Sequence, residues 1–185
     1  MHNIPNLITL GRILLVPLTV WLIISEAYGA AFLSFVVAGV SDGVDGFLAR
    51  RFNWRTELGA YLDPVADKSL LVSVYVALGF LKEVPAWLVI TIVSRDVLII
   101  GAVLLSRLMH KPLRMAPLMV SKVNTVAQII FAVAVLGVAA LGEPLGMLVN
   151  YGSIPVALLT VASGAAYLVS WLGHMAETPP EDKIS

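Results

Sequence analysis

The chain has 185 residues, of which 59% are hydrophobic and only 13% are charged, with a formal net charge of zero and a mean hydropathy of +0.92. Soluble domains carry about a quarter of charged residues, so this composition excludes an ordinary soluble domain and predicts a membrane protein. A neutral chain does not favour binding to nucleic acid, and the absence of cysteine excludes disulfides, thiolate nucleophiles and cysteine-based zinc sites.

Six apolar runs follow one another along the chain, and each is long enough to cross a bilayer. They cover residues 7–24, 30–48, 60–81, 86–106, 123–141 and 148–172. We therefore expect an all-α integral membrane protein in which six transmembrane helices form one domain over residues 1–174. The polar tail, residues 175–185, is expected to be disordered. No convincing cleavage site follows the first run, which we interpret as a retained span rather than a signal peptide.

The first span carries a polar stripe on an otherwise apolar helix. Asn6, Thr9 and Arg12 fall at positions i, i+3 and i+6, so they share one helical face. This stripe is a candidate ligand contact. The alternative is a structural role, with an N-terminal helix cap and an arginine that extends to the membrane surface.

The second and third spans carry two pairs of aspartates on either side of a short loop. Asp42 and Asp45 are three residues apart at the end of one span, and Asp63 and Asp67 are four apart at the start of the next. Each pair projects from one helical face, so the four carboxylates are expected to converge at one depth. An unpaired aspartate costs roughly 2.5–3.5 kcal/mol at the centre of a span, so neutralisation by two divalent cations, Mg²⁺ or Mn²⁺, is predicted. Such a two-metal site predicts a phosphorus-containing substrate.

Small and basic residues accompany the aspartates. Gly46 and Gly59 leave room for a bulky ligand near the backbone, and Arg50 is placed to pair with a phosphate or a carboxylate. The alternative is that the aspartates form structural ion pairs with Arg50, Arg55 or Lys68.

Basic residues gather in the loops after the second and fourth spans, at Arg50, Arg51, Arg55, Arg107, Lys111, Arg114 and Lys122. The loop after the third span has Lys82 alone, beside Glu83. The positive-inside rule then places the basic loops, the aspartates and both termini in the cytosol, with the active-site cavity open to that side. Within the fourth span, Arg95 and Asp96 form an ionisable pair that should face the protein interior.

The stretch "DGVDGFLARRFNWRTELGAYLDPVAD", residues 42–67, reads DxxDGxxAR, then eight residues, then GxxxDxxxD. This pattern resembles the signature of the CDP-alcohol phosphotransferases. The resemblance implies a six-helix membrane enzyme, commonly a homodimer, in which an acceptor hydroxyl displaces CMP from a CDP-linked lipid. It implies four metal-binding aspartates, Asp42, Asp45, Asp63 and Asp67, of which Asp67 is also the general base, and it implies that Gly46, Arg50 and Gly59 seat the nucleotide and its phosphates. The opening "NIPNLITLGR" is similar to the glycerophospholipid branch, which implies that Asn6, Thr9 and Arg12 lie near the cytidine.

Two further stretches bear on the acceptor. "SRDV" at 94–97 and "SKVNTVAQ" at 121–128 resemble the CMP-forming cardiolipin synthases of this family, whereas its phosphatidylglycerophosphate synthases tend to show a GKxKT-like stretch at the second place. Ser121 and Asn124 replace the glycine and the second lysine of that stretch, and one fewer cation favours a singly charged phosphodiester. We therefore expect transfer from CDP-diacylglycerol to phosphatidylglycerol, with Arg95, Arg114 and Lys122 at the acceptor.

Three other interpretations stay open from the sequence. Glycerol 3-phosphate is the alternative acceptor, and Arg114 supplies a charge that would suit it. A cation transporter also places acidic residues in the membrane, although such proteins often have them near the midplane of repeated halves. The last is a non-catalytic membrane interaction protein. For the enzyme, the expected location is a bacterial inner membrane.

Overall fold

The computed structural model describes residues 4–52, 57–108 and 119–176 of the chain. Side chains are described for most of these residues, but not for those before Gly11, nor for Arg12, Asp42, residues 44–67, Val103, residues 107–108 and residues 174–176. Throughout the described ranges the regular structure is α-helical. The helices are α1 (Ile4–Ile24), α2 (Tyr28–Phe52), α3 (Glu57–Phe80), α4 (Ala86–Leu108), α5 (Met119–Ala140) and α6 (Gly146–Ala176).

Each predicted apolar run lies on one helix, so the expected all-α architecture is confirmed. Among the described residues, three helical segments are long and apolar enough to cross a membrane: Ala86–Ser106, Met119–Ala140 and Gly146–Gly173. In the other described helices the apolar stretches are shorter, at Ile13–Ile24, Tyr28–Ser41 and Lys68–Phe80. Six membrane spans therefore stay a prediction. Helix α6 continues to Ala176, and the rest of the predicted tail lies outside the described residues.

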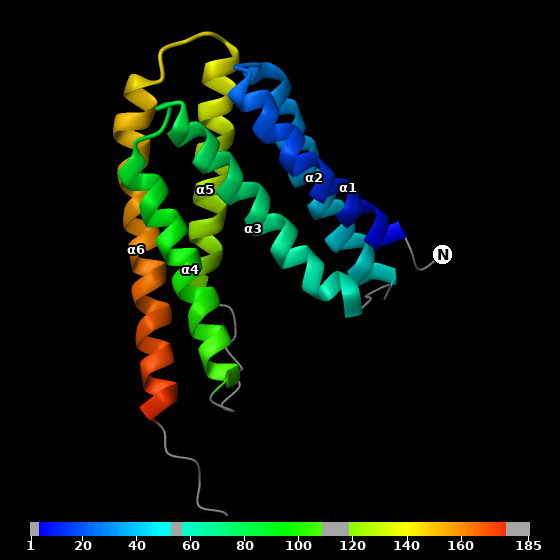
Figure 1. The fold of residues 1–185 in the computed structure, drawn as a ribbon, viewed down its shortest axis with the longest axis vertical. Helices are drawn as coiled ribbons and strands as arrows, with labels where there is room; N and C mark the ends of the chain where they lie inside the picture. The colour runs from blue at the N-terminus through cyan, green and yellow to red at the C-terminus, as the bar shows by residue number, and fades with distance from the viewer. Residues whose placement is uncertain (1–3, 53–56, 109–118, 177–185) are drawn as a thin grey trace, which may run out of the picture.

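Three short turns join the helices at one end of the molecule, and all three have the same backbone geometry (Figure 1). Each contains one residue with a positive φ, namely Glu26 (57°), Lys82 (62°) or Gly142 (71°). In each turn an N–H donates to the carbonyl five residues earlier, from Ala27 to Leu22, from Glu83 to Leu78 and from Glu143 to Val138. This is the Schellman end of a helix, which pairs carbonyls that the helix leaves unbonded. The chain therefore reverses within a few residues.

Because these turns are short, consecutive helices run in opposite directions. Helices α1, α3 and α5 begin at the opposite end of the molecule, where α2, α4 and α6 end (Figure 1). We call this the motif end, because both predicted aspartate segments lie there. In Figure 1, α4, α5 and α6 stand side by side, while α1 and α2 form a pair that leans away with α3.

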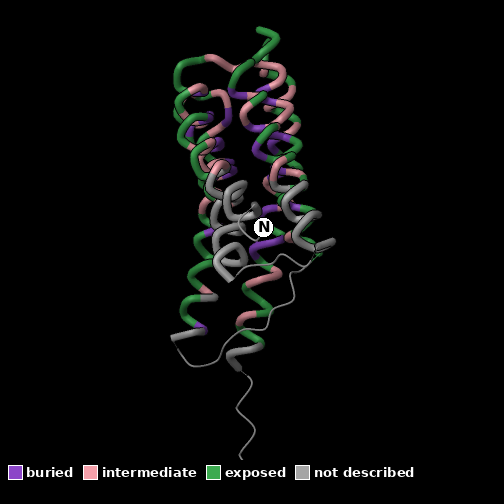
Figure 2. The backbone as a smooth tube through the Cα atoms, turned by 90° about the vertical axis from the view of Figure 1, so that its right-hand side faces the viewer, coloured by how far each residue is buried: buried purple, intermediate pink, exposed green. Residues whose placement is uncertain are grey.

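Among the residues whose side chains are described, the core lies inside the bundle (Figure 2). Helix α3 buries one face along Leu70, Val74 and Leu78, which are one turn apart. Beside them, the Tyr75 hydroxyl donates a 2.8 Å hydrogen bond to the Gln128 carbonyl and so links α3 to α5. This packing fixes α3 against α5 just above the motif end.

Candidate active site

The backbone brings the two aspartate segments to the same end of the molecule. Asp42 and Asp45 lie on the second half of α2, and Asp63 and Asp67 lie on the first half of α3. Helix α2 ends near the start of α3 at this end (Figure 1). The side chains of the four aspartates are outside the described residues. The predicted convergence therefore agrees with the backbone, and its side-chain geometry stays a prediction.

The other predicted donor-site residues lie on the same helix segments. Gly46 and Arg50 are on α2, Gly59 is on α3, and the stripe of Asn6, Thr9 and Arg12 is on the first turns of α1. All of these residues are at the motif end, because α1 and α3 begin there and α2 ends there (Figure 1). Their side chains are also outside the described part.

A cavity of about 370 Å³ lies between α2, α3, α4 and α5, next to the aspartate segments. Gly39 and Val40 of its wall precede Asp42 on α2, and Lys68 follows Asp67 on α3. The lining residues are Phe35, Val36, Ala38, Gly39, Val40, Lys68, Leu70, Leu71, Arg95, Asp96, Thr125, Ile129 and Val133.

The polar and apolar lining residues separate along the helix axes. On α3 and α5, which begin at the motif end, the polar Lys68 and Thr125 precede the apolar Leu71 and Val133. On α2, the lining residues from Phe35 to Val40 are all apolar, so the polar lining comes from α3, α4 and α5. The cavity is therefore amphiphilic, with its polar end next to the aspartate motif.

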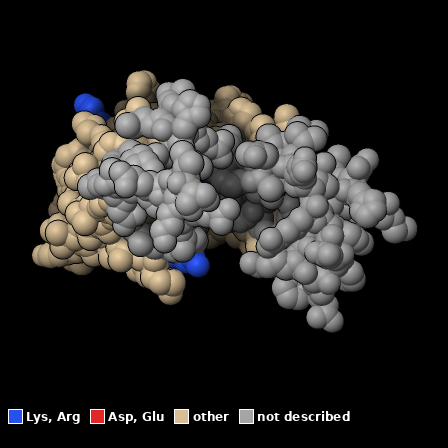
Figure 3. All heavy atoms as spheres, turned by 90° about the horizontal axis from the view of Figure 1, so that it is seen from below, with Lys and Arg blue, Asp and Glu red and all other residues tan. Residues whose placement is uncertain are grey.

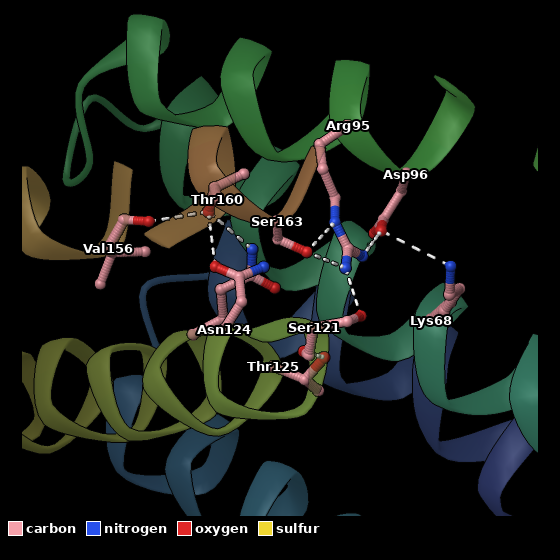
Figure 4. A network of polar contacts seen from close by, with 10 residues as sticks. Lys68, Arg95, Asp96, Ser121, Asn124, Thr125, Val156, Thr160 and Ser163 are labelled. Carbon is pink, nitrogen blue, oxygen red and sulfur yellow. Dashed lines mark hydrogen bonds and ion pairs between the residues drawn. The ribbon is translucent and has the colours of Figure 1, made fainter. Parts of the chain in front are cut away.

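Arg95 anchors a polar network that joins α4, α5 and α6 at the polar end of the cavity (Figure 4). Its Nη1 donates to Asp96 Oδ1 at 2.6 Å, and its Nη2 donates to Ser121 Oγ at 2.5 Å and to Ser163 Oγ at 2.7 Å. Nε also donates to Ser163 Oγ, at 3.2 Å, and the guanidinium carbon lies 5.8 Å from the centroid of the Tyr167 ring. These contacts occupy most of the five N–H donors of the guanidinium.

Asp96 also forms an ion pair with Lys68, which lies on the opposite wall of the cavity. Lys68 Nζ lies 3.5 Å from Asp96 Oδ1, and in Figure 4 the two side chains point toward each other across the space between α3 and α4. The Lys68 side chain is 40% exposed, whereas those of Asp96 and Arg95 are 11% and 6% exposed. The buried pair is thus Arg95 with Asp96, and Lys68 joins it from the open side.

The three residues predicted at the acceptor differ in their placement. Arg95 lines the cavity, but its donors are largely engaged within the protein. Lys122 is exposed on the first turns of α5 and is not among the lining residues. Arg114 lies outside the described residues. The structure therefore brings only Arg95 of this set to the cavity among the described positions.

Asn124 has a different environment from the one that the sequence comparison implied. It is fully buried between α5 and α6, where its Oδ1 accepts a 2.9 Å hydrogen bond from Thr160 Oγ1. Gln128 Nε2 donates to the same Thr160 oxygen at 3.1 Å, while Asn124 Nδ2 has no partner among the described atoms. Asn124 does not line the cavity, so its replacement of a lysine does not by itself change the charge there.

Sequence reasoning missed two sets of contacts, those of Lys68 and those of the polar residues of α6. Lys68 was considered only as a structural partner of the aspartates, and Ser163 and Thr160 of α6 were not considered at all. The available signal was the recurrence of polar residues every three or four positions in the apolar α5 and α6, because such residues in a membrane segment face other helices. Their partners could not be read from spacing.

The described atoms in view at the motif end belong mostly to uncharged residues. Figure 3 views the molecule from this end, and the described atoms on it include basic groups but no acidic ones. At the other end, the three turns contain Glu26, Lys82, Glu83 and Glu143. In the described part of the chain no three acidic or histidine residues cluster to hold a metal ion, and the side chains of the four motif aspartates lie outside that part.

Known proteins have sequences similar to that of this chain. A family model described as CDP-alcohol phosphatidyltransferase matches residues 2–172. The human protein named cardiolipin synthase (CMP-forming) is 38% identical over 148 residues, which cover 71% of this chain and 49% of the human protein. The CDP-diacylglycerol-glycerol-3-phosphate 3-phosphatidyltransferase of Bacillus subtilis (strain 168) is 35% identical over 151 residues, covering 74% of this chain and 77% of that protein.

A plant protein is also similar to this chain. The chloroplastic CDP-diacylglycerol-glycerol-3-phosphate 3-phosphatidyltransferase 1 of Oryza sativa subsp. japonica is 33% identical over 188 residues, covering 91% of this chain and 57% of that protein. The chain therefore spans about half the length of the human relative and more of the other two. From the aspartate motif and the family match over residues 2–172, the chain belongs to the CDP-alcohol phosphatidyltransferase family.

Proposed function

We propose that the protein transfers the phosphatidyl group of CDP-diacylglycerol to a hydroxyl of phosphatidylglycerol, releasing CMP and forming cardiolipin. The observation that carries this proposal is the amphiphilic cavity next to the aspartate motif. A lipid acceptor needs such a site, because its phosphodiester has to reach the reacting groups while its acyl chains stay in apolar surroundings. The human relative named cardiolipin synthase supports the same acceptor.

In the proposed reaction, the acceptor hydroxyl oxygen forms a bond to the phosphorus of the phosphatidyl group. The bond from that phosphorus to the bridging oxygen of the diphosphate breaks, and CMP leaves with that oxygen and the electron pair. Asp67 takes the hydroxyl proton as general base. Because a carboxylate is a weak base for an alcohol, orientation of the reactants and stabilisation of charge must supply most of the acceleration.

Asp42, Asp45, Asp63 and Asp67 are the residues that would hold two divalent cations, Mg²⁺ or Mn²⁺. The donor set fits these ions, because carboxylate oxygens are their preferred ligands and both aspartate segments lie at the motif end. When bound, the ions supply charge stabilisation for the diphosphate and for the leaving CMP.

The remaining roles of the donor-site residues rest on the family resemblance. We assign the nucleotide and its phosphates to Gly46, Arg50 and Gly59, and the cytidine side to Asn6, Thr9 and Arg12. Arg114 and Lys122 are proposed to attract the acceptor at the motif end. The contacts of Arg95 support a positioning role, because its guanidinium already bonds Asp96, Ser121 and Ser163.

We further propose that all six helices cross the membrane, with the motif end in the cytosol. The acidic turns at the other end support this orientation, since basic residues favour the cytosolic side. A location in a bacterial inner membrane and assembly as a homodimer are proposals that rest on the family resemblance.

The second candidate acceptor is glycerol 3-phosphate, because the Bacillus and rice relatives are named as glycerol-3-phosphate phosphatidyltransferases. The two acceptors differ in what they require of the cavity. Glycerol 3-phosphate has no acyl chain, so it leaves the apolar lining between Phe35 and Val133 without a role toward the acceptor.

An acceptor assay on the purified protein tests the proposal. With CDP-diacylglycerol and Mn²⁺ or Mg²⁺ present, CMP release is measured with phosphatidylglycerol, with glycerol 3-phosphate and with neither. We expect phosphatidylglycerol to stimulate CMP release and to yield cardiolipin. Stimulation of CMP release by glycerol 3-phosphate alone would support the second candidate function. CMP release that neither acceptor stimulates would contradict both candidate functions.

A further inference from the structure

Lys68 is the basic residue of the cavity wall that is least engaged by described side chains. Its Nζ lies 3.5 Å from Asp96 Oδ1, which is an ion-pair distance but is longer than a hydrogen bond between charged groups. By contrast, the Arg95 guanidinium reaches the same oxygen at 2.6 Å. Asp96 is therefore held tightly by Arg95 and only loosely by Lys68.

The charges on this wall do not balance within the described residues. Arg95 and Asp96 form a buried neutral pair, so Lys68 adds one positive charge at the polar end of the cavity. A buried pair of this kind stays intact, because separating it would leave an uncompensated charge. Lys68 is partly exposed, so it can exchange Asp96 for another anion at small cost.

The position of Lys68 on α3 relates this charge to the reaction. It follows Asp67 directly, and consecutive residues of a helix point about 100° apart. Asp63 and Asp67 are one turn apart and share a face of α3, whereas Lys68 faces α4 and the cavity. A group bound to Lys68 is thus next to the position of Asp67 along the helix, but about 100° around the helix axis from the face that Asp63 and Asp67 share.

We propose that the Lys68 ammonium binds the phosphodiester of the lipid acceptor, and that the Arg95–Asp96 pair holds Lys68 in place when the cavity is empty. The single positive charge matches the single negative charge of a phosphodiester, and the apolar lining beyond Lys68 accommodates the adjoining acyl chain. Arg95 and Asp96 act as positioning residues in this arrangement, because Arg95 holds the Asp96 carboxylate that Lys68 approaches. The inference rests on the proposed acceptor.

The alternative is that Lys68 binds the diphosphate of the donor, because an ammonium group can bind either phosphate. The orientation of Lys68 toward α4 favours the acceptor, and separate measurements on the two substrates distinguish them. In a third alternative, Lys68 only stabilises the packing of α3 against α4. Its replacement would then lower the stability of the protein without selectively changing the affinity for either substrate.

The test uses Lys68→Ala and Lys68→Arg in the full-length protein, with Lys82→Ala as a matched control. Lys82 is an exposed lysine in the turn between α3 and α4, at the far end from the motif. For each protein, the KM values for phosphatidylglycerol and CDP-diacylglycerol, the melting temperature and the direct binding of short-chain phosphatidylglycerol are measured.

We expect Lys68→Ala to raise the KM for phosphatidylglycerol and the Kd for its short-chain form by roughly 10- to 100-fold, because a charged hydrogen bond is lost. The KM for CDP-diacylglycerol should stay within about twofold, Lys68→Arg should restore most of the acceptor affinity, and Lys82→Ala should behave as the wild type. A rise in the donor KM alone, or unchanged acceptor binding by Lys68→Ala, would overturn the inference. If wild-type protein neither binds nor uses phosphatidylglycerol, the proposed function itself fails, which is a separate and recognisable outcome.

Discussion

At the scale of single residues, the roles proposed for the motif aspartates rest on the sequence, whereas those proposed for Arg95 and Lys68 rest on the structure. The spacing of the aspartates predicted their chemistry, because four acidic residues in membrane segments need neutralisation. No spacing predicted that Asp96 would be shared between Arg95 and Lys68, since this depends on how α3 packs against α4. The roles of these cations follow from burial, with Arg95 enclosed and Lys68 open to the cavity.

Neutralising one of the aspartates that we propose to bind metal should abolish activity while leaving the protein folded. We expect this of Asp42→Asn, Asp45→Asn and Asp63→Asn, because the ions require the carboxylate charge and asparagine preserves its shape. CMP release at saturating Mn²⁺ and the melting temperature are measured together, with Glu26→Gln in the opposite turns as the control. Turnover at the wild-type rate in any of the three would refute the two-metal assignment.

Asp67→Asn should separate binding from chemistry. A general base contributes about 10²- to 10⁴-fold to the rate, so turnover should fall by that range while CDP-diacylglycerol still binds. Titration of the donor into the purified variant gives its Kd. Loss of donor binding by a folded variant would mean that Asp67 mainly seats the donor.

Arg95→Met should lower the stability of the protein by about 3–5 kcal/mol, because the buried Asp96 carboxylate loses its main partner. The melting temperature in detergent reports this loss, with Lys82→Met on the exposed turn as the control. Adding Asp96→Leu to Arg95→Met should recover part of the stability, since an apolar pair leaves no buried charge. If the melting temperature of Arg95→Met equals that of the wild type, the polar network does not hold α4, α5 and α6 together.

At the scale of helices, close packing between α5 and α6 depends on a glycine. A Cβ atom added at Gly152 would lie 2.6 Å from Phe131 Cε2 and 2.9 Å from Cδ2, closer than such atoms approach. The Phe131 ring is 5% exposed and packs within the core, so it has little room to move. The two helices can therefore approach closely only because position 152 has no side chain.

Gly152→Ala should destabilise the protein by about 1–3 kcal/mol through overpacking. The matched control is Gly173→Ala in the same helix, where an added Cβ meets no atom within 4 Å. Thermal unfolding in detergent measures both. A Gly152→Ala variant as stable as its control would show that α6 does not contact Phe131 in this way.

Helix positions were predictable from the sequence, but the pairing of helix faces was not. In lipid a segment must satisfy its own backbone hydrogen bonds, so each long apolar run predicts one helix, and all six runs lie on helices. Asn124 illustrates the limit. Its helix and face follow from its spacing, yet its contact with Thr160 depends on the rotation of α5 against α6.

At the scale of the whole molecule, the arrangement of the turns places all the candidate catalytic segments at one end. Three short turns close the opposite end, so α1 and α3 start, and α2 and α4 end, where the motif lies (Figure 1). A water-soluble nucleotide and a lipid phosphate can meet at such an end. This requires the motif end to lie at the cytosolic surface of the membrane.

Single cysteines can test this orientation, because the chain has none of its own. In intact cells of a bacterial expression host, Glu143→Cys in the exposed turn between α5 and α6 should react with a membrane-impermeant maleimide. Lys122→Cys, exposed near the start of α5, should react only after the cells are opened. The reverse pattern would place the aspartate motif outside the cytosol.

The most direct test of the proposed reaction follows the acyl chains into the product. Purified protein receives unlabelled CDP-diacylglycerol, phosphatidylglycerol with deuterated acyl chains, glycerol 3-phosphate and Mn²⁺, and the lipids are analysed by mass spectrometry. Transfer of a phosphatidyl group to phosphatidylglycerol predicts cardiolipin with one labelled and one unlabelled pair of chains, together with an equal amount of CMP. Unlabelled phosphatidylglycerophosphate with no cardiolipin, or cardiolipin in which both pairs of chains are labelled, would contradict it.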